Sequence, residues 1–197
     1  YGLDKETELL QLRVMRSLNN DEHKRVDIVS TFLGAHAVPQ EYGGRTDDYV
    51  DYMIEEVLPA IRAEHTVTFC DVFCEKGVFS LEQSERLLRA ARHHRFKLKM
   101  HADEIVPFGG AELAASLKCV SADHLLHVSD TGIKRLARAI RSICSSSAKS
   151  TRYINFFLPS FSLFPNTCAL HFRSSHDIFW CKSQLYGCSA PFFTVNK

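Results

Sequence analysis

The chain has 197 residues, 45% of them hydrophobic and 24% charged, a composition that predicts one globular domain with a sizeable core. The formal net charge of +1 gives no reason to expect nucleic acid or an anionic membrane surface as a partner. No run approaches the roughly 18 apolar residues needed to span a bilayer, and no secretory leader is visible, so we expect no membrane partner.

Helical and strand-like patterns alternate along the first two thirds of the chain. In chain order the predicted elements are a helix over 9–18, a strand over 26–36, a helix over 47–62, a strand over 67–75, a helix over 80–94, a strand over 97–102, a helix over 109–117 and a strand over 119–126. Apolar residues at i, i+3 and i+4 spacing predict the helices, and continuous apolar runs predict the strands. In the first helix, Leu10, Val14 and Leu18 lie on one stripe. The third helix begins with a capping box between Ser80 and Gln83.

This alternation predicts the fold class. Strands separated by helices are typical of βαβ units and a parallel sheet, so we expect an α/β fold with the helices outside the sheet. His101 and His124 lie 23 positions apart, which is about one strand–helix step of an α/β barrel. No glycine-rich phosphate-binding motif follows a strand, which argues against a nucleotide-binding sheet.

The pattern changes beyond residue 136. Residues 137–197 are rich in Ser and Phe and have little periodicity. A helix rich in Arg (Arg135, Arg138, Arg141) can extend into this segment, but no strand–helix alternation continues. We therefore expect two parts: residues 1–136 form the α/β fold, and the remainder is an atypical tail outside it.

Ionisable side chains stand at the ends of all four predicted strands. They are His36, Glu75, the group His101, Asp103 and Glu104, and the group Asp123, His124 and His127. Because the carboxyl ends of parallel strands meet at the same end of a sheet, we expect these side chains to lie close together. Neutral imidazole is a ligand for Zn²⁺ and Fe²⁺, and a nearby carboxylate can move protons. A single histidine of this kind is more often a surface or hydrogen-bonded residue, so the prediction depends on all four strand ends together.

Seven cysteines leave an odd number for pairing, and Cys70 and Cys74 stand at C-x₃-C spacing in one predicted strand. A zinc–thiolate site would need a second pair, and none is placed to match. Buried reduced thiols are the favoured interpretation, which indicates a reducing, cytoplasmic setting.

Several blocks of the sequence resemble a known family. The blocks "VSTFLGAHAVPQEY", "KMHADEIVPFGGAELAASL" and "VSADHLLHVSDTGI" resemble successive blocks of the imidazolonepropionases, which are amidohydrolase-superfamily enzymes of histidine degradation. The resemblance begins at Tyr1, ends at about Ile133, and keeps the family's order and nearly its spacing. It implies that this part of the chain is a partial (β/α)₈ barrel, about strands three to six.

The same resemblance implies roles for five residues. His101 matches the family's metal-binding histidine after the fifth strand, and Glu104 the carboxylate that contacts the imidazolone ring. His124 matches the sixth-strand histidine that activates water or holds the intermediate. His36 and Tyr1 match substrate-binding residues.

The resemblance also implies an activity. It is the hydrolysis of 4-imidazolone-5-propanoate to N-formimidoyl-L-glutamate with one zinc or iron ion, and it leaves open a homodimer of the full-length parent. The family's H-x-H metal pair, an Arg that holds the propionate and an eighth-strand Asp ligand have no counterpart in these 197 residues. We therefore expect this chain alone to be inactive.

Two alternatives stay open at this point. One is another amidohydrolase, such as a guanine or hydantoin-type deaminase, although the order of the blocks argues against it. The other is a non-catalytic remnant that at most binds a partner, since one metal-binding His out of four ligands cannot hold a catalytic ion.

Overall fold

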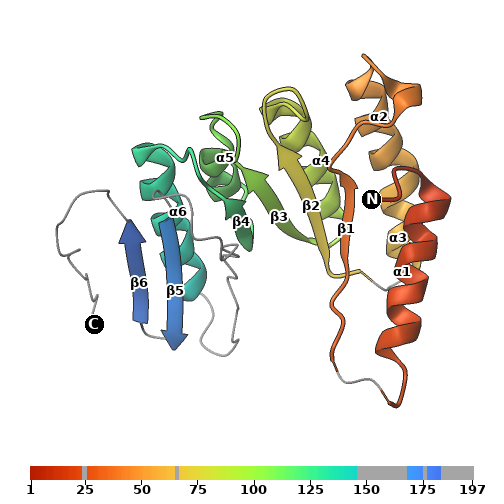
Figure 1. Cartoon of the computed structure of the whole chain (residues 1–197), viewed down its shortest axis with the longest axis horizontal. Coiled ribbons are helices and arrows are strands. Elements are labelled where there is room, and N and C mark those ends of the chain that lie inside the picture. The colour runs from red at the N-terminus through yellow and green to blue at the C-terminus, as the bar shows by residue number, and fades with distance from the viewer. Residues whose placement is uncertain (24–25, 65–66, 146–167, 175–176, 183–197) are drawn as a thin grey trace.

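The computed structural model describes residues 1–23, 26–64, 67–145, 168–174 and 177–182 (Figure 1). In chain order its elements are α1 (Lys5–Asn19), β1 (Thr31–Ala35), the 3₁₀ turn η1 (Gln40–Tyr42), α2 (Thr46–Tyr52), the π-helical turn η2 (Met53–Val57), α3 (Leu58–Glu64), β2 (Phe69–Cys74), α4 (Leu81–His93), β3 (Lys97–Ala102), α5 (Gly110–Ser116), β4 (Ser121–His124), α6 (Asp130–Ser145), β5 (Cys168–Ser174) and β6 (Asp177–Lys182).

The first four strands form one sheet in the order β1-β2-β3-β4. All three neighbouring pairs are parallel, with Thr31 of β1 opposite Phe69 of β2 and His101 of β3 opposite Asp123 of β4. The prediction of an α/β fold with adjacent parallel strands is therefore confirmed. The strands β5 and β6 form a separate antiparallel pair.

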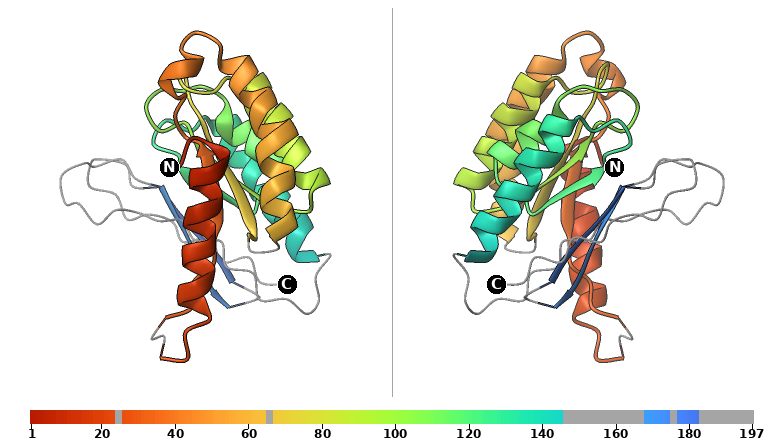
Figure 2. Two further views of the ribbon diagram at one scale, coloured as in Figure 1. Left: turned by 90° about the vertical axis from the view of Figure 1, so that its right-hand side faces the viewer. Right: turned by 90° about the vertical axis from the view of Figure 1, so that its left-hand side faces the viewer.

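One face of the parallel sheet packs against the helices that connect its strands (Figure 2). The alternation along β3 shows how the two faces differ, because Leu98, Met100 and Ala102 are buried while Lys99 and His101 are only partly buried. The helix-facing side chains form the hydrophobic core. The opposite face of β3 carries the ionisable groups, so the sheet itself divides core from site.

The first strand is shorter than the predicted 26–36. Val26 and Val29 are 69% and 64% exposed, and β1 begins only at Thr31. Its partner β2 begins at Phe69, which lies opposite Thr31, so the preceding apolar residues have no strand beside them. The apolar run therefore predicted a longer strand than the part that pairs with β2.

The apolar stripe of α1 does not face the core. Leu10, Val14 and Leu18 are 60%, 50% and 54% exposed, whereas Leu9 and Leu12 are buried. The stripe and the core-facing residues lie on different sides of the same helix, so periodicity located the helix but not its buried side.

The helix predicted over 47–62 is interrupted by a π-helical turn. The N–H of Leu58 bonds to the carbonyl of Met53, five residues back, and Pro59 follows immediately. Proline lacks an N–H, and its ring crowds the carbonyl four residues earlier, which here belongs to Glu55. The wider π turn is a common way to relieve such crowding without ending a helix.

The predicted boundary at residue 136 lies inside α6 (Asp130–Ser145). Arg135, Arg138 and Arg141 all fall within this helix, as the Arg-rich pattern indicated. Most of the predicted tail lies outside the described residues, so the division into two parts stays a prediction.

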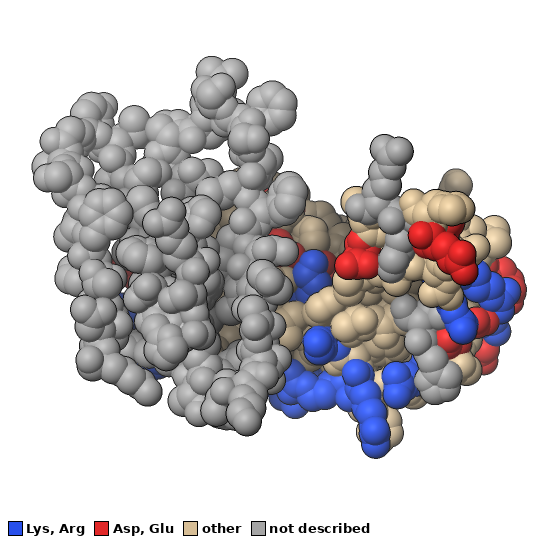
Figure 3. Space-filling view, turned by 90° about the horizontal axis from the view of Figure 1, so that it is seen from below, with Lys and Arg blue, Asp and Glu red and all other residues tan. Residues whose placement is uncertain are grey.

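Two surface properties bear on partners. Figure 3 views the molecule from below, the side on which β1 and β2 begin, and shows both basic and acidic side chains among the uncharged residues of this face. Among the described residues, none of the helices combines the length and apolar composition that a membrane crossing requires.

Candidate active site

Three imidazole rings lie in a row where the strands end. His36 directly follows β1, His101 is in β3, and His124 ends β4. The ring centroids of His36 and His101 are 4.7 Å apart, and those of His101 and His124 are 4.9 Å apart. The four strands β1, β2, β3 and β4 lie parallel and side by side in the sheet, which brings together residues that are far apart in the sequence.

Glu104 completes one end of this row. Its Oε2 lies 3.3 Å from Nε2 of His124, and both side chains are about two-thirds buried, with 31% and 28% exposed. His124 has a left-handed backbone, with φ of 71°, which turns the chain sharply at the end of β4. A carboxylate and an imidazole at this distance can share or exchange a proton.

Tyr1 lies at the other end of the row. Its ring stacks on His36 with the centroids 5.3 Å apart, although the residue as a whole is 66% exposed. The buried carboxylate of Glu8 accepts hydrogen bonds from the N–H groups of Gly2 and Leu3, at 2.7 and 3.2 Å. Glu8 thereby fixes the backbone that presents Tyr1 to His36.

His36 is an imidazole that is almost completely buried. It is 7% exposed, and neither of its ring nitrogens has a hydrogen-bond partner among the described residues. Burial lowers the pKa of His36 to about 4, despite the nearby charge of Asp71. The ring is therefore neutral at physiological pH and can accept a hydrogen bond or bind a cation.

Asp71 belongs to the site, although the sequence analysis did not single it out. It is 1% exposed in the middle of β2, and its Oδ1 lies 3.1 Å from Nδ1 of His101. Burial alone would lower the pKa of His101, but the hydrogen bond and charge of Asp71 outweigh it and raise that pKa. A lone carboxylate within the apolar run "FCDVFC" was the available signal, because a buried charge requires a partner.

Lys99 and Asp123 form a second layer beneath the row. The Nζ of Lys99 lies 3.7 Å from Oδ2 of Asp71 and 3.6 Å from Oδ2 of Asp123. Burial raises the pKa of Asp123, and Lys99 acts in the opposite direction. One cation between two carboxylates reduces the cost of burying both.

The site contains a group of side chains that fits a divalent metal ion. His36, Asp71 and His101 each offer one ligand atom, and these atoms all lie within 4.8 Å of one another. Within the described part of the chain, Oδ2 of Asp71 and both nitrogens of His36 lack hydrogen-bond partners. Imidazole and carboxylate are donors that suit Zn²⁺ and Fe²⁺. The residues present are therefore chemically suited to such an ion.

Three other strand-end candidates are not in the row. Glu75 is buried and accepts hydrogen bonds from the N–H groups of Lys76, Glu104 and Ile105. It supports the backbone that carries Glu104 and is not bonded to the imidazoles.

Asp103 and His127 do not join the site either. The Asp103 carboxylate accepts hydrogen bonds from the four N–H groups of residues 108–111, where α5 begins. His127 is exposed, and its N–H donates to the carbonyl of Asp103. For these two residues the predicted convergence was wrong, because residues after a strand end need not continue toward the sheet's open end.

Cys70, Cys74 and Cys119, the cysteines whose side chains the structure describes, are free and belong to no metal-ligand group. Burial raises the pKa of Cys74 to about 11 and that of Cys119 to about 12, so both are protonated thiols at neutral pH. The group of His36, Asp71 and His101 is the metal-ligand group that the described residues contain, and it includes no cysteine.

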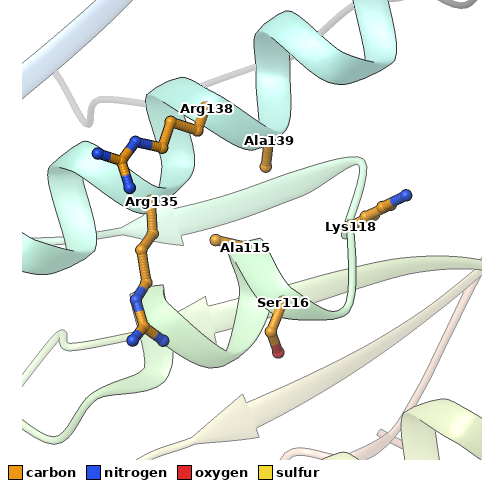
Figure 4. Close-up of a pocket in the computed structure, with 6 residues that line it drawn as sticks. All are labelled: Ala115, Ser116, Lys118, Arg135, Arg138 and Ala139. Atoms are coloured by element: carbon orange, nitrogen blue, oxygen red, sulfur yellow. The ribbon is translucent and has the colours of Figure 1, made fainter.

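A hollow of about 320 Å³ lies between α5 and α6, away from the row of imidazoles (Figure 4). It is lined by Ala115, Ser116, Lys118, Arg135, Arg138 and Ala139. These side chains include no carboxylate and no imidazole, so the hollow lacks the metal-binding side chains that the row of imidazoles has.

We compared the sequence of the chain with known proteins to identify its relatives. No protein-family model matches the chain. The imidazolonepropionase of Parabacteroides distasonis is 88% identical over 139 residues, which are 71% of this chain and 33% of that protein. The enzyme of the same name from Bacteroides thetaiotaomicron is 68% identical over 139 residues, and that from Clostridium tetani is 58% identical over 137 residues. The resemblance to the imidazolonepropionases is confirmed.

The chain spans about a third of the length of these imidazolonepropionases, 33% for the first and second relatives. The five residues for which the imidazolonepropionase resemblance implies roles form one continuous chain of contacts. Tyr1 touches His36, His36 touches His101, His101 touches His124, and His124 touches Glu104.

Proposed function

We propose that this chain supplies part of the active site of an imidazolonepropionase, a metal-dependent hydrolase that converts 4-imidazolone-5-propanoate and water to N-formimidoyl-L-glutamate. The single observation that carries the proposal is the contact row from Tyr1 to Glu104. It lies in a chain that is 88% identical to an imidazolonepropionase over 139 residues.

The proposed architecture is strands three to six of a (β/α)₈ barrel, contributed by residues 1–136. Two features support it. The strands follow one another in the sheet in sequence order, without the reversal of order that an open doubly wound sheet has. The helices α4 and α5 pack on the same face, and the polar face with His101 is on the opposite side, as the interior of a barrel would be.

The proposed substrate-binding residues are Tyr1, His36 and Glu104. A flat five-membered ring can stack against the Tyr1 and His36 rings, which are themselves stacked. Glu104 is an acceptor for a ring N–H, and its backbone is held by Glu75. The neutral His36 can hydrogen-bond a ring carbonyl or nitrogen without introducing a charge.

The proposed proton-transfer groups are His124 and Glu104, which lie 3.3 Å apart. In the reaction the oxygen of water bonds to the ring carbonyl carbon, and the bond from that carbon to the ring nitrogen breaks. One proton of the water must reach the departing nitrogen. His124 can take that proton and deliver it, and Glu104 can hold it in between.

The proposed metal ion is zinc or iron, with His101 as its ligand in this chain. When bound, such an ion acts as a Lewis acid that polarises a carbonyl oxygen or water. Two observations support an ion here: the ring nitrogens of His36 beside His101 make no hydrogen bond among the described residues, and the negative charge of Asp71 lies nearby. A cytoplasmic location, with the buried free thiols in its favour, and a homodimer of the full-length protein stay predictions.

The proposed function is tested by transplantation. The 139 matched residues of this chain replace their counterparts in the Parabacteroides distasonis imidazolonepropionase, and hydrolysis is followed by loss of the imidazolone chromophore. We expect the chimera to be active, and His101→Ala, Glu104→Gln and His124→Ala in it to lose at least about 100-fold in kcat/KM. His127→Ala, which changes an exposed imidazole nearby, is the control and should have little effect.

The result also separates the alternatives. An inactive but folded chimera would favour a non-catalytic remnant, and a chimera that prefers another cyclic amide would favour a different amidohydrolase activity. The 197 residues by themselves should show no hydrolysis, because His101 is the single family-type metal ligand among them.

A further inference from the structure

We propose that Asp71 is a positioning residue for His101: its carboxylate holds the imidazole in the tautomer with the proton on Nδ1 and thereby presents Nε2 to the open end of the sheet. This inference rests on the proposed role of His101 as a metal ligand. It adds a residue to which neither the family resemblance nor the sequence pattern gave a role.

The first step is the hydrogen bond itself. Oδ1 of Asp71 lies 3.1 Å from Nδ1 of His101. An ionised carboxylate can only accept hydrogen bonds, so the proton between these atoms belongs to the imidazole. In the neutral ring, a proton on Nδ1 leaves the lone pair on Nε2. The contact therefore specifies which nitrogen of His101 is available to a ligand.

The second step is that Asp71 is itself held in place. It is 1% exposed within β2, two residues along the strand from Phe69 and directly opposite Lys99 in the register with β3. The ammonium group of Lys99 lies 3.7 Å from its other oxygen, Oδ2. With Lys99 on one oxygen and His101 on the other, the carboxylate has little freedom to turn away.

The third step concerns the purpose of such an arrangement. Metal-ligating histidines usually donate their second ring N–H to a carboxylate or carbonyl, which fixes the ring and raises its basicity. His101 has neighbours on both sides, with His36 and His124 rings 4.7 and 4.9 Å away. The bond to Asp71 is the polar contact that determines how its ring is turned between them.

Direct metal binding by Asp71 is the competing interpretation. Its ligand atom lies within 4.8 Å of those of His36 and His101, which would allow all three to approach one ion. The position of Lys99 argues against it, because a cation 3.7 Å from the same carboxylate disfavours a second cation there. The two interpretations differ in whether the hydrogen bond from Nδ1 of His101 to Asp71 survives when the metal binds.

The test reads the tautomer of His101 directly. The 197-residue chain, labelled with ¹⁵N-histidine and free of metal and substrate, is examined by long-range ¹H–¹⁵N correlation NMR at a pH where the ring is neutral. We expect His101 to carry its proton on Nδ1. A wild-type spectrum with the proton on Nε2 overturns the proposal without the need for any variant.

Three variants show whether Asp71 is the cause. Asp71→Ala should let His101 populate both tautomers, while Asp71→Asn should keep the proton on Nδ1, because the amide oxygen still accepts. Asp123→Asn is the matched control: it removes the same charge from the other partner of Lys99, which has no bond to His101. An equal change in Asp123→Asn and Asp71→Ala would show a general electrostatic effect and contradict the proposal.

A metal titration separates the competing interpretation. When Zn²⁺ is added to the metal-free chimera, which has the full ligand set, positioning by Asp71 predicts that the Nδ1 proton of His101 persists. Loss of that proton, with Nδ1 bound to Zn²⁺, would overturn positioning by Asp71. In the chimera, Asp71→Ala should lower Zn²⁺ affinity about 10–100-fold, with Asp71→Asn closer to wild type. The tautomer measurement needs no activity, so failure of the proposed hydrolase function would leave its result unaffected.

Discussion

The Glu75 carboxylate accepts a hydrogen bond from the backbone N–H of Glu104 at 3.0 Å, between the ends of β2 and β3. The same carboxylate accepts from the N–H groups of Ile105 and Lys76, and Glu75 is only 1% exposed. A buried carboxylate with three donors is a rigid support. It fixes the turn that carries the Glu104 side chain to His124.

We predict that Glu75→Gln destabilises the protein by about 1–3 kcal/mol, because the amide NH₂ would face an N–H that needs an acceptor. Urea unfolding of both proteins measures the loss. Glu85→Gln is the control, since the Glu85 side chain on α4 is 40% exposed with Arg89 as its partner, and about 0.5 kcal/mol or less is expected. Equal losses in the two variants would mean that Glu75 does not support this turn.

A second stability prediction concerns Asp103, which supports the start of α5. Its two oxygens accept from four N–H groups at the start of the helix, at distances from 2.8 to 3.3 Å. Asp103→Asn keeps one acceptor oxygen, and Asp103→Ala keeps none, so the free energy of unfolding should fall further in the Ala variant. Its backbone φ of 50° adds to the cost, because Asn tolerates the left-handed region better than Ala. Ala and Asn variants of equal stability would contradict this account of the turn.

The order and type of the elements could be predicted because periodicity reports burial. The strand over 97–102 has the predicted bounds, and the capping box from Ser80 to Gln83 is present in the structure. Parallel strands then place residues that end them at one end of the sheet, which is why His36, His101 and His124 could be grouped from the sequence.

Contacts that depend on tertiary packing could not be predicted. The sequence contained Asp71, but only the register of β2 against β3 shows that it lies beside His101 and Lys99. Likewise, an apolar stripe on α1 indicated a helix, but the side that packs is decided by neighbouring elements. Asp103 resembled a site residue because its carboxylate follows a strand, whereas the turn into α5 directs it to backbone N–H groups.

The two sides of α1 can be compared with adjacent leucines. Leu9 is 7% exposed and Leu10 is 60% exposed. We predict that Leu9→Ala lowers the free energy of unfolding by about 2–4 kcal/mol, because it leaves a cavity in the core. Leu10→Ala should change it by about 0.5 kcal/mol or less. Chemical denaturation compares the two variants, and a larger loss for Leu10→Ala would show that the exposed stripe is covered in solution.

The last prediction concerns Glu8 and the pH dependence of stability. Burial raises the pKa of Glu8 above its ordinary value of 4.5, even though the N–H groups of Gly2 and Leu3 act in the opposite direction. The folded protein therefore holds the Glu8 proton more tightly than the unfolded chain does. Its contribution to stability is greatest below about pH 4.5 and is lost as the pH rises through the raised folded pKa.

Glu8→Gln removes this titration but keeps an oxygen that can accept from Gly2 and Leu3. We expect the free energy of unfolding of the variant, relative to wild type, to increase as the pH rises from 4.5 toward 7. The slope cannot exceed about 1.4 kcal/mol per pH unit, since a single proton is involved. Glu6→Gln, at an exposed position of the same helix turn, is the matched control for removing one carboxylate. If the pH profiles of Glu8→Gln and wild type are parallel, the pKa of Glu8 is the same in the folded and unfolded chains. The hydrogen bonds from Gly2 and Leu3 would then fully offset the cost of burying the Glu8 carboxylate.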